Sequence, residues 1–274
     1  MSDPRPEAIR RLTAAGVDNP RLDTRLLWDH AQHNSGAFEG YVRRRIGREP
    51  VAYITGHKEF WSLDFEVGPG VLIPRPETET VVEQVLTYFP GSAAPLKILD
   101  LGTGSGCLLV SLLKEFRSAR GVGIDSSEIA RATASRNVAR HGLADRAEIA
   151  DGDWMESVAG DWDVVVSNPP YIATADIAGL APEVRFEPFV ALDGGDDGLD
   201  AVRALAAQFG RHLKGTAFVE IGAGQAESAQ ALIAAEGLFV VNIAPDLAGI
   251  PRILIIRRSA SGSEKRVGIG PVTG

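Results

Sequence analysis

The five residues SNPPY, Ser167 to Tyr171, directly follow the apolar run Val164 to Val166. Two consecutive prolines remove two backbone donors and fix two φ angles. A strand that ends in this way holds the Asn168 side-chain amide and the proline carbonyls rigidly at its end. Because Asn-Pro is also a common turn opener, the motif is consistent with a plain turn or with a site that holds a planar polar group.

The second interpretation of SNPPY implies a specific chemistry. An amide nitrogen is a poor nucleophile because its lone pair is delocalised into the carbonyl. Two acceptors, the Asn168 side-chain oxygen and the Pro169 carbonyl, could bind its two N–H protons, with Tyr171 as a wall of the pocket. Catalysis would then consist mainly of positioning and electrostatics, and the proton could leave after the nitrogen has reacted.

A glycine-rich stretch, LDLGTGSGC, follows one predicted strand and opens a predicted helix, which is the context of a nucleotide-binding loop. A dinucleotide loop of pattern G-x-G-x-x-G would need glycine at position 107, where Cys107 stands. The spacing G-x-G-x-G resembles that of S-adenosylmethionine methyltransferases, whose ligand has no pyrophosphate. The alternative is a tight strand-to-helix turn. The predicted cofactor contacts in this loop are Gly102, Thr103, Gly104, Ser105 and Gly106.

Two acidic residues and a tryptophan extend this predicted cofactor site. Asp125 ends the next strand, roughly 20 positions after the loop, where a carboxylate can accept both ribose hydroxyl protons. Asp153 could meet the adenine amino group, and Trp154 could pack on the adenine ring. The structural alternatives are a helix cap for Asp125 and a core position for Trp154. Asn168 would face the reactive methyl group.

The elements that position these residues alternate between strand and helix from residue 97 onward, which predicts a doubly wound α/β domain with a largely parallel sheet. Predicted strands cover 97–101, 121–125, 147–151, 162–167, 216–222, 238–244 and 252–258. Predicted helices cover 107–116, 127–142, 199–213 and 225–235, with a further helix starting at Pro76 and Glu77.

The preceding residues read as short helices followed by a β-hairpin. In the segment PRLDTRLLWDHAQH, Leu22, Leu26, Leu27 and His30 are expected on one buried face. The stretch NSG at 34–36 breaks the chain before another helix that runs to about residue 46. Residues 58–73 alternate apolar and polar side chains around Gly-Pro-Gly, a hairpin signal. The tail 259–274 lacks an apolar period and is predicted to be disordered.

Composition excludes several classes of protein. The net charge of −8 over 274 residues argues against affinity based on wide contact with a phosphate backbone; the basic run YVRRRIGR is interpreted as a solvated helix face. One cysteine and five scattered histidines predict no intrachain disulfide and no metal site. The charged N-terminus and the lack of an apolar run near 18 residues predict a cytoplasmic protein without a membrane segment.

Further stretches carry a resemblance to a known family. REPVAYITGHKEFWSLDFEV, VLIPRPETE, LDLGTGSGC, SNPPYI and EVRFEPFVALDGGDDGL together closely resemble the peptide chain release factor N5-glutamine methyltransferases. The resemblance implies a seven-stranded class I methyltransferase domain (77–258) behind a helical docking domain (1–57) and a hairpin linker (58–76). It also implies S-adenosylmethionine as the donor and the glutamine of the Gly-Gly-Gln loop in class 1 release factors as the acceptor.

The resemblance further implies a role for each part of the site. Asn168, Pro169, Pro170 and Tyr171 would hold the glutamine, and Arg185 and Glu187 of RFEP would lie near the substrate mouth. A monomer without stable nucleic-acid binding is expected. The helical region looks shorter than is usual for the family around HNSGAF, and that domain is expected to dock the release factor.

Three other functions compete with this prediction. The nearest is methylation of a glutamine in a ribosomal protein, which shares fold, donor and chemistry. Adenine N6 methylation of DNA would need a target-recognition region and a basic cleft, for which the acidic chain has no evident room. A catalytically silent S-adenosylmethionine-binding adaptor is the third, and the intact SNPPY motif argues against it.

Overall fold

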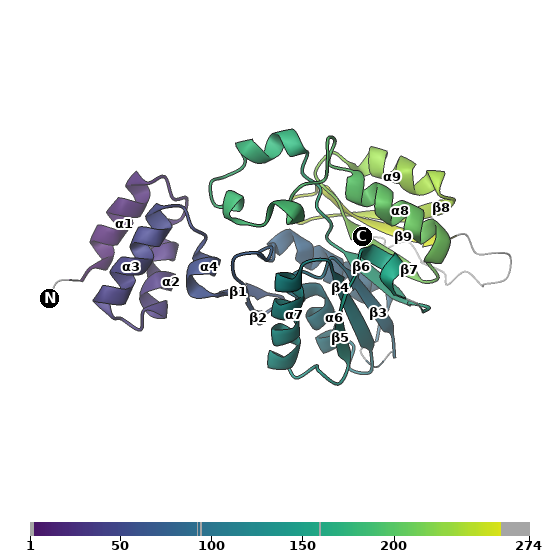
Figure 1. Cartoon of the computed structure of the whole chain (residues 1–274), viewed down its shortest axis with the longest axis horizontal. Helices are drawn as coiled ribbons and strands as arrows, with labels where there is room; N and C mark the ends of the chain where they lie inside the picture. Colours follow the sequence, from purple (N-terminus) through teal and green to yellow (C-terminus); the bar gives the residue numbers. More distant parts are fainter. Residues whose placement is uncertain (1–2, 92, 94, 159, 259–274) are drawn as a thin grey trace, which may run out of the picture.

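The computed structural model describes residues 3–258 except 92, 94 and 159, so the predicted disordered tail lies outside the described residues. A helical N-terminal unit occupies one end of the molecule, and a larger unit of sheet and helices occupies the other (Figure 1). A short two-stranded hairpin follows the helical unit in the chain. Among the described residues, no helix is both long enough and apolar enough to cross a membrane.

Four helices form the N-terminal unit: α1 (Arg5–Ala14), α2 (Pro20–His30), α3 (Ser35–Ile46) and α4 (Val51–Thr55). They enclose a small core that includes Leu12, Leu27 and Phe38. The predicted break before the third helix is confirmed, and Asn34 is its N-cap, accepting from the Gly36 and Ala37 amides at 3.0 Å.

The predicted buried face of α2 is wrong in part. Leu27 is fully buried, but Leu22 and Leu26 are 44% and 41% exposed. The helix instead turns Asp23 inward, where its carboxylate accepts from Arg45 Nε at 2.7 Å. A buried charge must be paired, so this ion pair sets the rotation of the helix against α3.

The prediction of a solvated face for YVRRRIGR is also wrong in part: Arg43 and Arg44 are exposed, but Arg45 and Arg48 are not. Arg45 is only 6% exposed, and both Arg45 and Arg48 donate to the Glu183 carboxylate at 2.7–2.8 Å. Burial acts to raise the pKa of Glu183, but the hydrogen bonds from Arg48 and Arg45 outweigh it and lower that pKa to about 2. The basic run therefore ties the helical unit to a loop that lies 135 residues further along the chain.

The β-hairpin is present, but its turn is not at Gly-Pro-Gly. Strands β1 (His57–Phe60) and β2 (Leu63–Glu66) pair through a turn at Trp61 and Ser62, whose φ angles are +52° and +56°. This two-residue turn with two positive φ angles matches the twist of paired strands. Gly68 to Gly70 follow the second strand, where Gly70 lines the cleft described below.

In the described part of the chain, seven strands form the main sheet in the order β5-β4-β3-β6-β7-β9-β8. All neighbours are parallel except β7–β9 and β8–β9. The strands are β3 (Lys97–Leu101), β4 (Arg120–Asp125), β5 (Ala147–Asp151), β6 (Val164–Ser167), β7 (Thr216–Glu220), β8 (Leu238–Pro245) and β9 (Pro251–Arg258).

Helices cover both faces of this sheet. The helices are α5 (Glu79–Tyr88), α6 (Cys107–Glu115), α7 (Glu128–Arg140), α8 (Asp200–His212) and α9 (Ala226–Ala235). The 3-10 turns are η1 (Pro76–Thr78), η2 (Trp154–Ser157), η3 (Thr174–Gly179), η4 (Val184–Phe186) and η5 (Phe189–Ala191). Apolar residues of α5 and α6 pack into one core, and those of α8 and α9 into a second core. The predicted strand and helix alternation is confirmed.

The strand order reverses between β3 and β6, since the chain runs outward from β3 to β5 and then returns to β6. In open parallel sheets, ligands bind at such a switch point, beyond the carboxyl ends of the strands. The glycine loop follows β3 and the SNPP turn follows β6. The fold therefore brings the two sequence motifs to the same crevice.

Candidate active site

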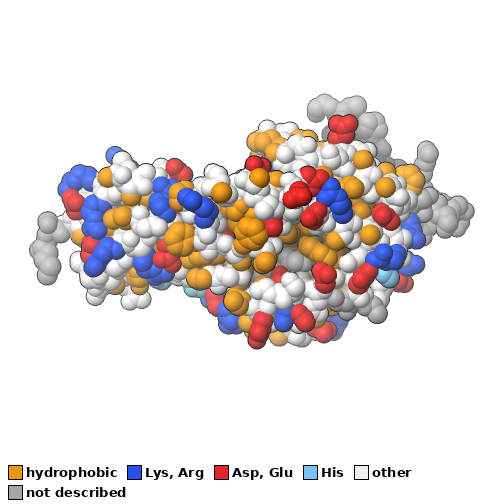
Figure 2. Space-filling view, turned by 45° about the horizontal axis from the view of Figure 1, so that its top comes forward, with side chains coloured by type: hydrophobic (Ala, Val, Ile, Leu, Met, Phe, Trp, Pro, Cys, Tyr) orange, Lys and Arg blue, Asp and Glu red, His pale blue; other side chains and the backbone are white. Residues whose placement is uncertain are grey.

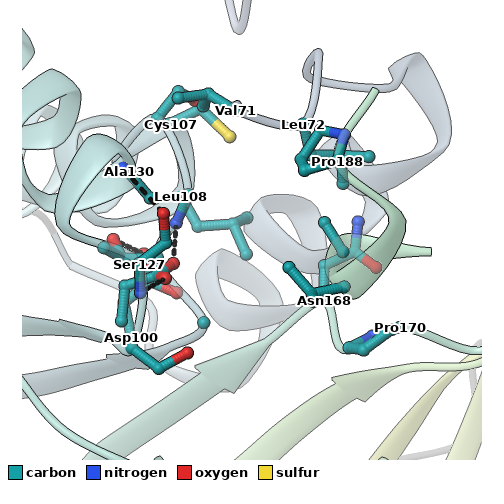
Figure 3. Close-up of a pocket in the computed structure, with 18 of the residues that line it drawn as sticks. Val71, Leu72, Asp100, Cys107, Leu108, Ser127, Ala130, Asn168, Pro170 and Pro188 are labelled. Carbon is teal, nitrogen blue, oxygen red and sulfur yellow. Dashed lines mark hydrogen bonds between the residues drawn. The ribbon is translucent and has the colours of Figure 1, made fainter. Parts of the chain in front are cut away.

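A cleft opens at this switch point. Its empty volume is about 1030 Å³, which includes solvent space at its open mouth. Its wall includes the glycine loop, the ends of β4 and β6, and the segments 70–75 and 188–191. Figure 3 shows Asp100 on one side of the cleft and Asn168 on the opposite side. On the outer surface, apolar side chains gather around a hollow near the middle of the molecule (Figure 2).

The glycine loop is held from its β4 side. The Gly102 and Thr103 amides both donate to the Ile124 carbonyl at 2.9 Å. Gly102 and Gly104 have φ angles of +71° and +56° and line the cleft. Gly106 has a different role: a Cβ on it would lie 3.3 Å from the Ala134 Cβ, so this glycine allows α6 to pack against α7. Gly106 is not part of the cleft wall.

Asp125 braces this loop at the end of β4. One carboxylate oxygen accepts from the Gly104 amide at 2.9 Å, and the other accepts from the Ser127 amide at 2.9 Å. The residue also lines the cleft. The alternative of a turn cap before α7 is therefore confirmed. The ligand role of Asp125 stays a prediction, and it is compatible with the cap because each oxygen has a second lone pair.

Trp154 and Asp153 close the cleft over the glycine loop. A Cβ built on Gly102 would lie 3.5 Å from the Trp154 ring, which is an ordinary van der Waals contact, so the ring packs directly on the glycine loop. Trp154 itself has a φ of +56°, a conformation that non-glycine residues seldom adopt. Such strain is found where surrounding structure holds a functional group in place.

Asp100 is a cleft residue that the sequence reasoning missed. Its Oδ2 accepts from Thr103 Oγ1 at 2.6 Å and from the Leu109 amide at 3.3 Å. Its Oδ1 is buried without a hydrogen-bond partner among the described residues. Burial raises the pKa of Asp100 to about 7. The available signal was an acidic residue inside the apolar strand KILDL, because a carboxylate in a buried strand needs a special reason.

The charge of the cleft limits what it can bind. Three carboxylates line it, from Asp100, Asp125 and Asp153, and its one guanidinium, Arg75, is paired with Glu187 at 2.6 Å. This donor-poor, acidic wall suits a ligand with positive charge, hydroxyls and amino groups. It does not suit a phosphate, which would need cations or free backbone amides. A cationic nucleoside such as S-adenosylmethionine fits this requirement.

Asn168 separates this cleft from a second one. It follows β6, and its Nδ2 donates to Thr78 Oγ1 at 2.9 Å. Pro169 and Tyr171 line only the second cleft, whereas Asn168 and Pro170 line both, together with Leu72, Arg75 and Ala191. The second cleft also contains Leu72, Arg75, Glu77, Ile172, Leu180, Val184, Ala191, Leu192 and Arg252. Within SNPPY, Asn168 and Pro170 are therefore part of the wall that the two clefts share. A plain turn does not explain this position.

Arg185 and Glu187 lie outside both clefts. Arg185 is exposed on η4. Glu187 is buried, and its carboxylate accepts from the Ile73 amide at 2.9 Å and from Arg75. This link fastens the loop 184–191 to the segment 71–75, so that Pro188, Val190 and Ala191 line the first cleft. Glu187 therefore shapes the mouth of the site through its neighbours.

Comparison with known proteins identifies the class and the family. A family model described as "Methyltransferase small domain" matches residues 82–182. A methyltransferase from Pyrococcus furiosus superposes with a TM-score of 0.53 over 73% of this chain and 90% of its own, at 19% identity, a likeness of fold. Together with the seven-stranded sheet and its glycine loop, these matches define a class I methyltransferase and confirm the predicted fold class.

Two relatives narrow the class. The release factor glutamine methyltransferase of Rhodospirillum rubrum is 46% identical over 92% of this chain and 83% of its own length. The protein of the same name from Caulobacter vibrioides is 42% identical over 89% of this chain and 92% of its own length. The chain belongs to the release factor glutamine methyltransferase family, which confirms the resemblance found in its sequence.

Proposed function

We propose that the protein transfers a methyl group from S-adenosylmethionine to the side-chain amide nitrogen of the glutamine in the Gly-Gly-Gln loop of class 1 release factors. The observation that carries this proposal is the position of Asn168 and Pro170 as a shared wall between two clefts. One cleft is acidic and suits the donor. The other presents Pro169 and Tyr171 and suits a planar amide.

In this proposal the first cleft holds the donor. Asp125 accepts hydrogen bonds from the ribose hydroxyls with the lone pairs that the Gly104 and Ser127 amides leave free. Trp154 covers the adenine ring, and Asp153 faces its amino group. Asp100, whose pKa burial raises to about 7, becomes a carboxylate more readily beside a cation. S-adenosylmethionine supplies an electrophilic methyl group on its sulfonium.

The second cleft holds the acceptor amide. The Asn168 side-chain oxygen and the Pro169 carbonyl accept the two N–H protons and aim the nitrogen at the shared wall. Accepting both protons favours loss of the amide's planarity, because it concentrates electron density on the nitrogen. Tyr171 stays a neutral phenol, since burial raises its pKa to about 12. No described side chain has to remove a proton before the nitrogen reacts.

The helical unit is proposed as the docking domain, with boundaries at 1–57, 58–76 and 77–258 as the sequence predicts. Its support is the contact of Arg45 and Arg48 with Glu183, next to the loop that forms the cleft mouth. The unit holds nine arginines and seven acidic residues over residues 1–57, whereas the whole chain has a net charge of −8. A cytoplasmic monomer without stable nucleic-acid binding completes the proposal.

A parallel methylation assay tests this function. The purified protein is incubated with methyl-labelled S-adenosylmethionine and, separately, release factor, ribosomes or DNA. Label is expected on release factor alone, on the Gly-Gly-Gln glutamine as located by peptide mass spectrometry. Label on a ribosomal protein or on DNA in place of release factor would overturn the proposal. A release factor with Gln→Glu at that position is the matched control, because it removes the amide nitrogen.

A further inference from the structure

A buried carboxyl group lies behind the proposed acceptor site. Glu220 is the last residue of β7, next to the SNPP turn after β6, and is 1% exposed. Its Oε1 accepts from the Tyr171 hydroxyl at 3.4 Å. Its Oε2 is buried with no hydrogen bond of good geometry among the described residues. A carboxyl group buried at this depth loses its hydration, so it must be neutral or have hydrogen-bond partners. The proposed reaction does not itself require Glu220.

The Thr78 hydroxyl connects Glu220 to Asn168. Thr78 is 2% exposed, on η1. Its oxygen accepts from Asn168 Nδ2 at 2.9 Å. Its hydroxyl also interacts with the Glu220 carboxyl, and this interaction opposes the rise in the Glu220 pKa that burial causes. The three side chains come from positions 78, 168 and 220, so only the folded sheet brings them together.

The number of hydrogens on each group fixes which group donates and which accepts in this hydrogen-bond network. A hydroxyl has one hydrogen to donate, and a carboxylate can only accept. When Thr78 donates to the Glu220 carboxylate, its oxygen can bind Asn168 only through the Nδ2 hydrogen. With the Asn168 amide reversed, Thr78 would have to donate to Oδ1, and the carboxylate would lose its hydroxyl donor.

We propose that Glu220 is a positioning residue for the transfer reaction: through Thr78 it selects the orientation of the Asn168 amide that turns the side-chain oxygen toward the acceptor nitrogen. The inference rests on the proposed function, because it assigns the Asn168 oxygen its task. A wrongly turned amide would present N–H groups to the N–H groups of the acceptor. The oxygen and nitrogen ends of the Asn168 amide have nearly the same shape, and the network selects the one orientation that serves the reaction.

The charge state of Glu220 gives the network a pH dependence. Burial raises the pKa of Glu220 to about 7, with Thr78, Arg252 and Tyr171 opposing the rise and Glu77 adding to it. A protonated Glu220 can donate to Thr78, which can then donate to the Asn168 oxygen. The productive orientation is thus held above about pH 7 and is progressively lost as the pH falls below it.

Kinetics of paired variants test the network. Thr78→Val is expected to lower kcat on release factor by about tenfold to a hundredfold, and Glu220→Gln by about tenfold, with the donor Kd unchanged within about threefold. Thr78→Ser restores the hydroxyl and should recover most of kcat. In an Asn168→Ala background, Thr78→Val should change kcat by less than about twofold, because the residues act as one unit. Equal losses in both backgrounds would overturn the proposal.

A spectroscopic test needs no acceptor and therefore separates this inference from the proposed function. The chain has five asparagines, so ¹⁵N-asparagine labelling gives five side-chain amide pairs, and Asn168→Ala identifies one of them. The Asn168 pair should shift with pH around a midpoint near 7 in the wild-type protein and stay constant in Glu220→Gln. Identical Asn168 signals in the wild type, Glu220→Gln and Thr78→Val between pH 5.5 and 8.5 would contradict the network. Absence of methylation by the wild type would instead contradict the proposed function.

Discussion

The two clefts that meet at Asn168 are built in different ways. The first is made largely of short connections that follow β3, β4 and β5, and backbone amides hold it, such as Gly102 and Thr103 on the Ile124 carbonyl. The polar groups at and behind the wall that the second cleft shares with the first come from distant positions. Thr78 lines the first cleft, Asn168 lines both, and Glu220 is buried behind Tyr171. The first cleft thus depends on local loop geometry, and the second on the packing of the whole sheet.

This difference predicts that binding of the donor and turnover can be damaged separately. Substitutions at strand ends of the first cleft should weaken donor affinity. Substitutions at Asn168 and behind it should slow the reaction and leave donor affinity nearly intact.

Asn168→Ala should lower kcat on release factor by about 10²–10³, which corresponds to about 3–4 kcal/mol for the loss of one preorganised hydrogen bond. The substitution removes the acceptor oxygen and leaves an acceptor N–H unpaired in the cleft. Steady-state methylation with saturating release factor measures the effect. Turnover near that of the wild type would mean that SNPPY is only a turn.

Asn168→Asp should also turn over well below the wild type, but for a different reason. It keeps an oxygen at this position and adds a negative charge beside a sulfonium. That charge stabilises the cationic ground state, whereas the transfer disperses the positive charge. Donor affinity should therefore be equal or higher, as calorimetry can measure, and a weaker donor affinity would contradict this account of the wall.

Asp125→Ala should weaken binding of S-adenosylmethionine by about 1–3 kcal/mol, the usual loss for a charged hydrogen-bond acceptor. Part of the loss comes from the Gly104 amide, which loses the Asp125 carboxylate as its hydrogen-bond acceptor. Calorimetric titration measures the Kd. Unchanged affinity would remove Asp125 from the donor site.

Deleting residues 1–47 should leave donor affinity nearly intact, because every described residue that lines the donor cleft lies beyond residue 69. Release factor methylation should fall through a KM that is higher by about tenfold, an order of magnitude that corresponds to about 1.4 kcal/mol. Circular dichroism must first show that the truncated chain folds, since Glu183 loses its partner Arg45. Glu183→Gln in the full chain, which breaks the same contact with less disruption, should raise KM in the same direction. Full efficiency of the folded truncation would exclude a docking role.

Much of the first cleft could be predicted from the sequence, because its signals are local. The spacing of Gly102, Gly104 and Gly106 and the strand-end place of Asp125 follow from elements that run a few residues each. The sequence could not tell that Gly106 serves helix packing, since this depends on Ala134 of another helix. Asp100 was not predicted as a cleft residue, although an acidic residue within an apolar strand is unusual.

The second cleft and the helical unit were less predictable because distant pairs decide them. The apolar period predicted that Leu26 is buried, but the ion pair of Asp23 with Arg45 turns the other face of α2 inward. The basic run was predicted to be solvated because its partner Glu183 lies 135 residues further along the chain. Glu220 gave no signal in TAFVEIG beyond its charge, since its partner Thr78 lies 142 positions earlier. The hydrophobic period can be read from neighbouring residues. Buried ion pairs and hydrogen-bond networks join residues that are distant in the sequence, so they cannot be read in this way.

One paired measurement distinguishes the role of Asp125 in donor binding from the role of Asn168 in turnover. Donor Kd by calorimetry and the single-turnover rate on release factor at saturating donor are measured for Asp125→Ala and Asn168→Ala side by side. The account predicts a crossed pattern: Asp125→Ala weakens Kd and nearly keeps the rate, while Asn168→Ala keeps Kd within about threefold and loses about a hundredfold or more in rate. If Asn168→Ala weakened donor binding as much as it slowed transfer, Asn168 would not be the wall between two clefts, and the account would be wrong.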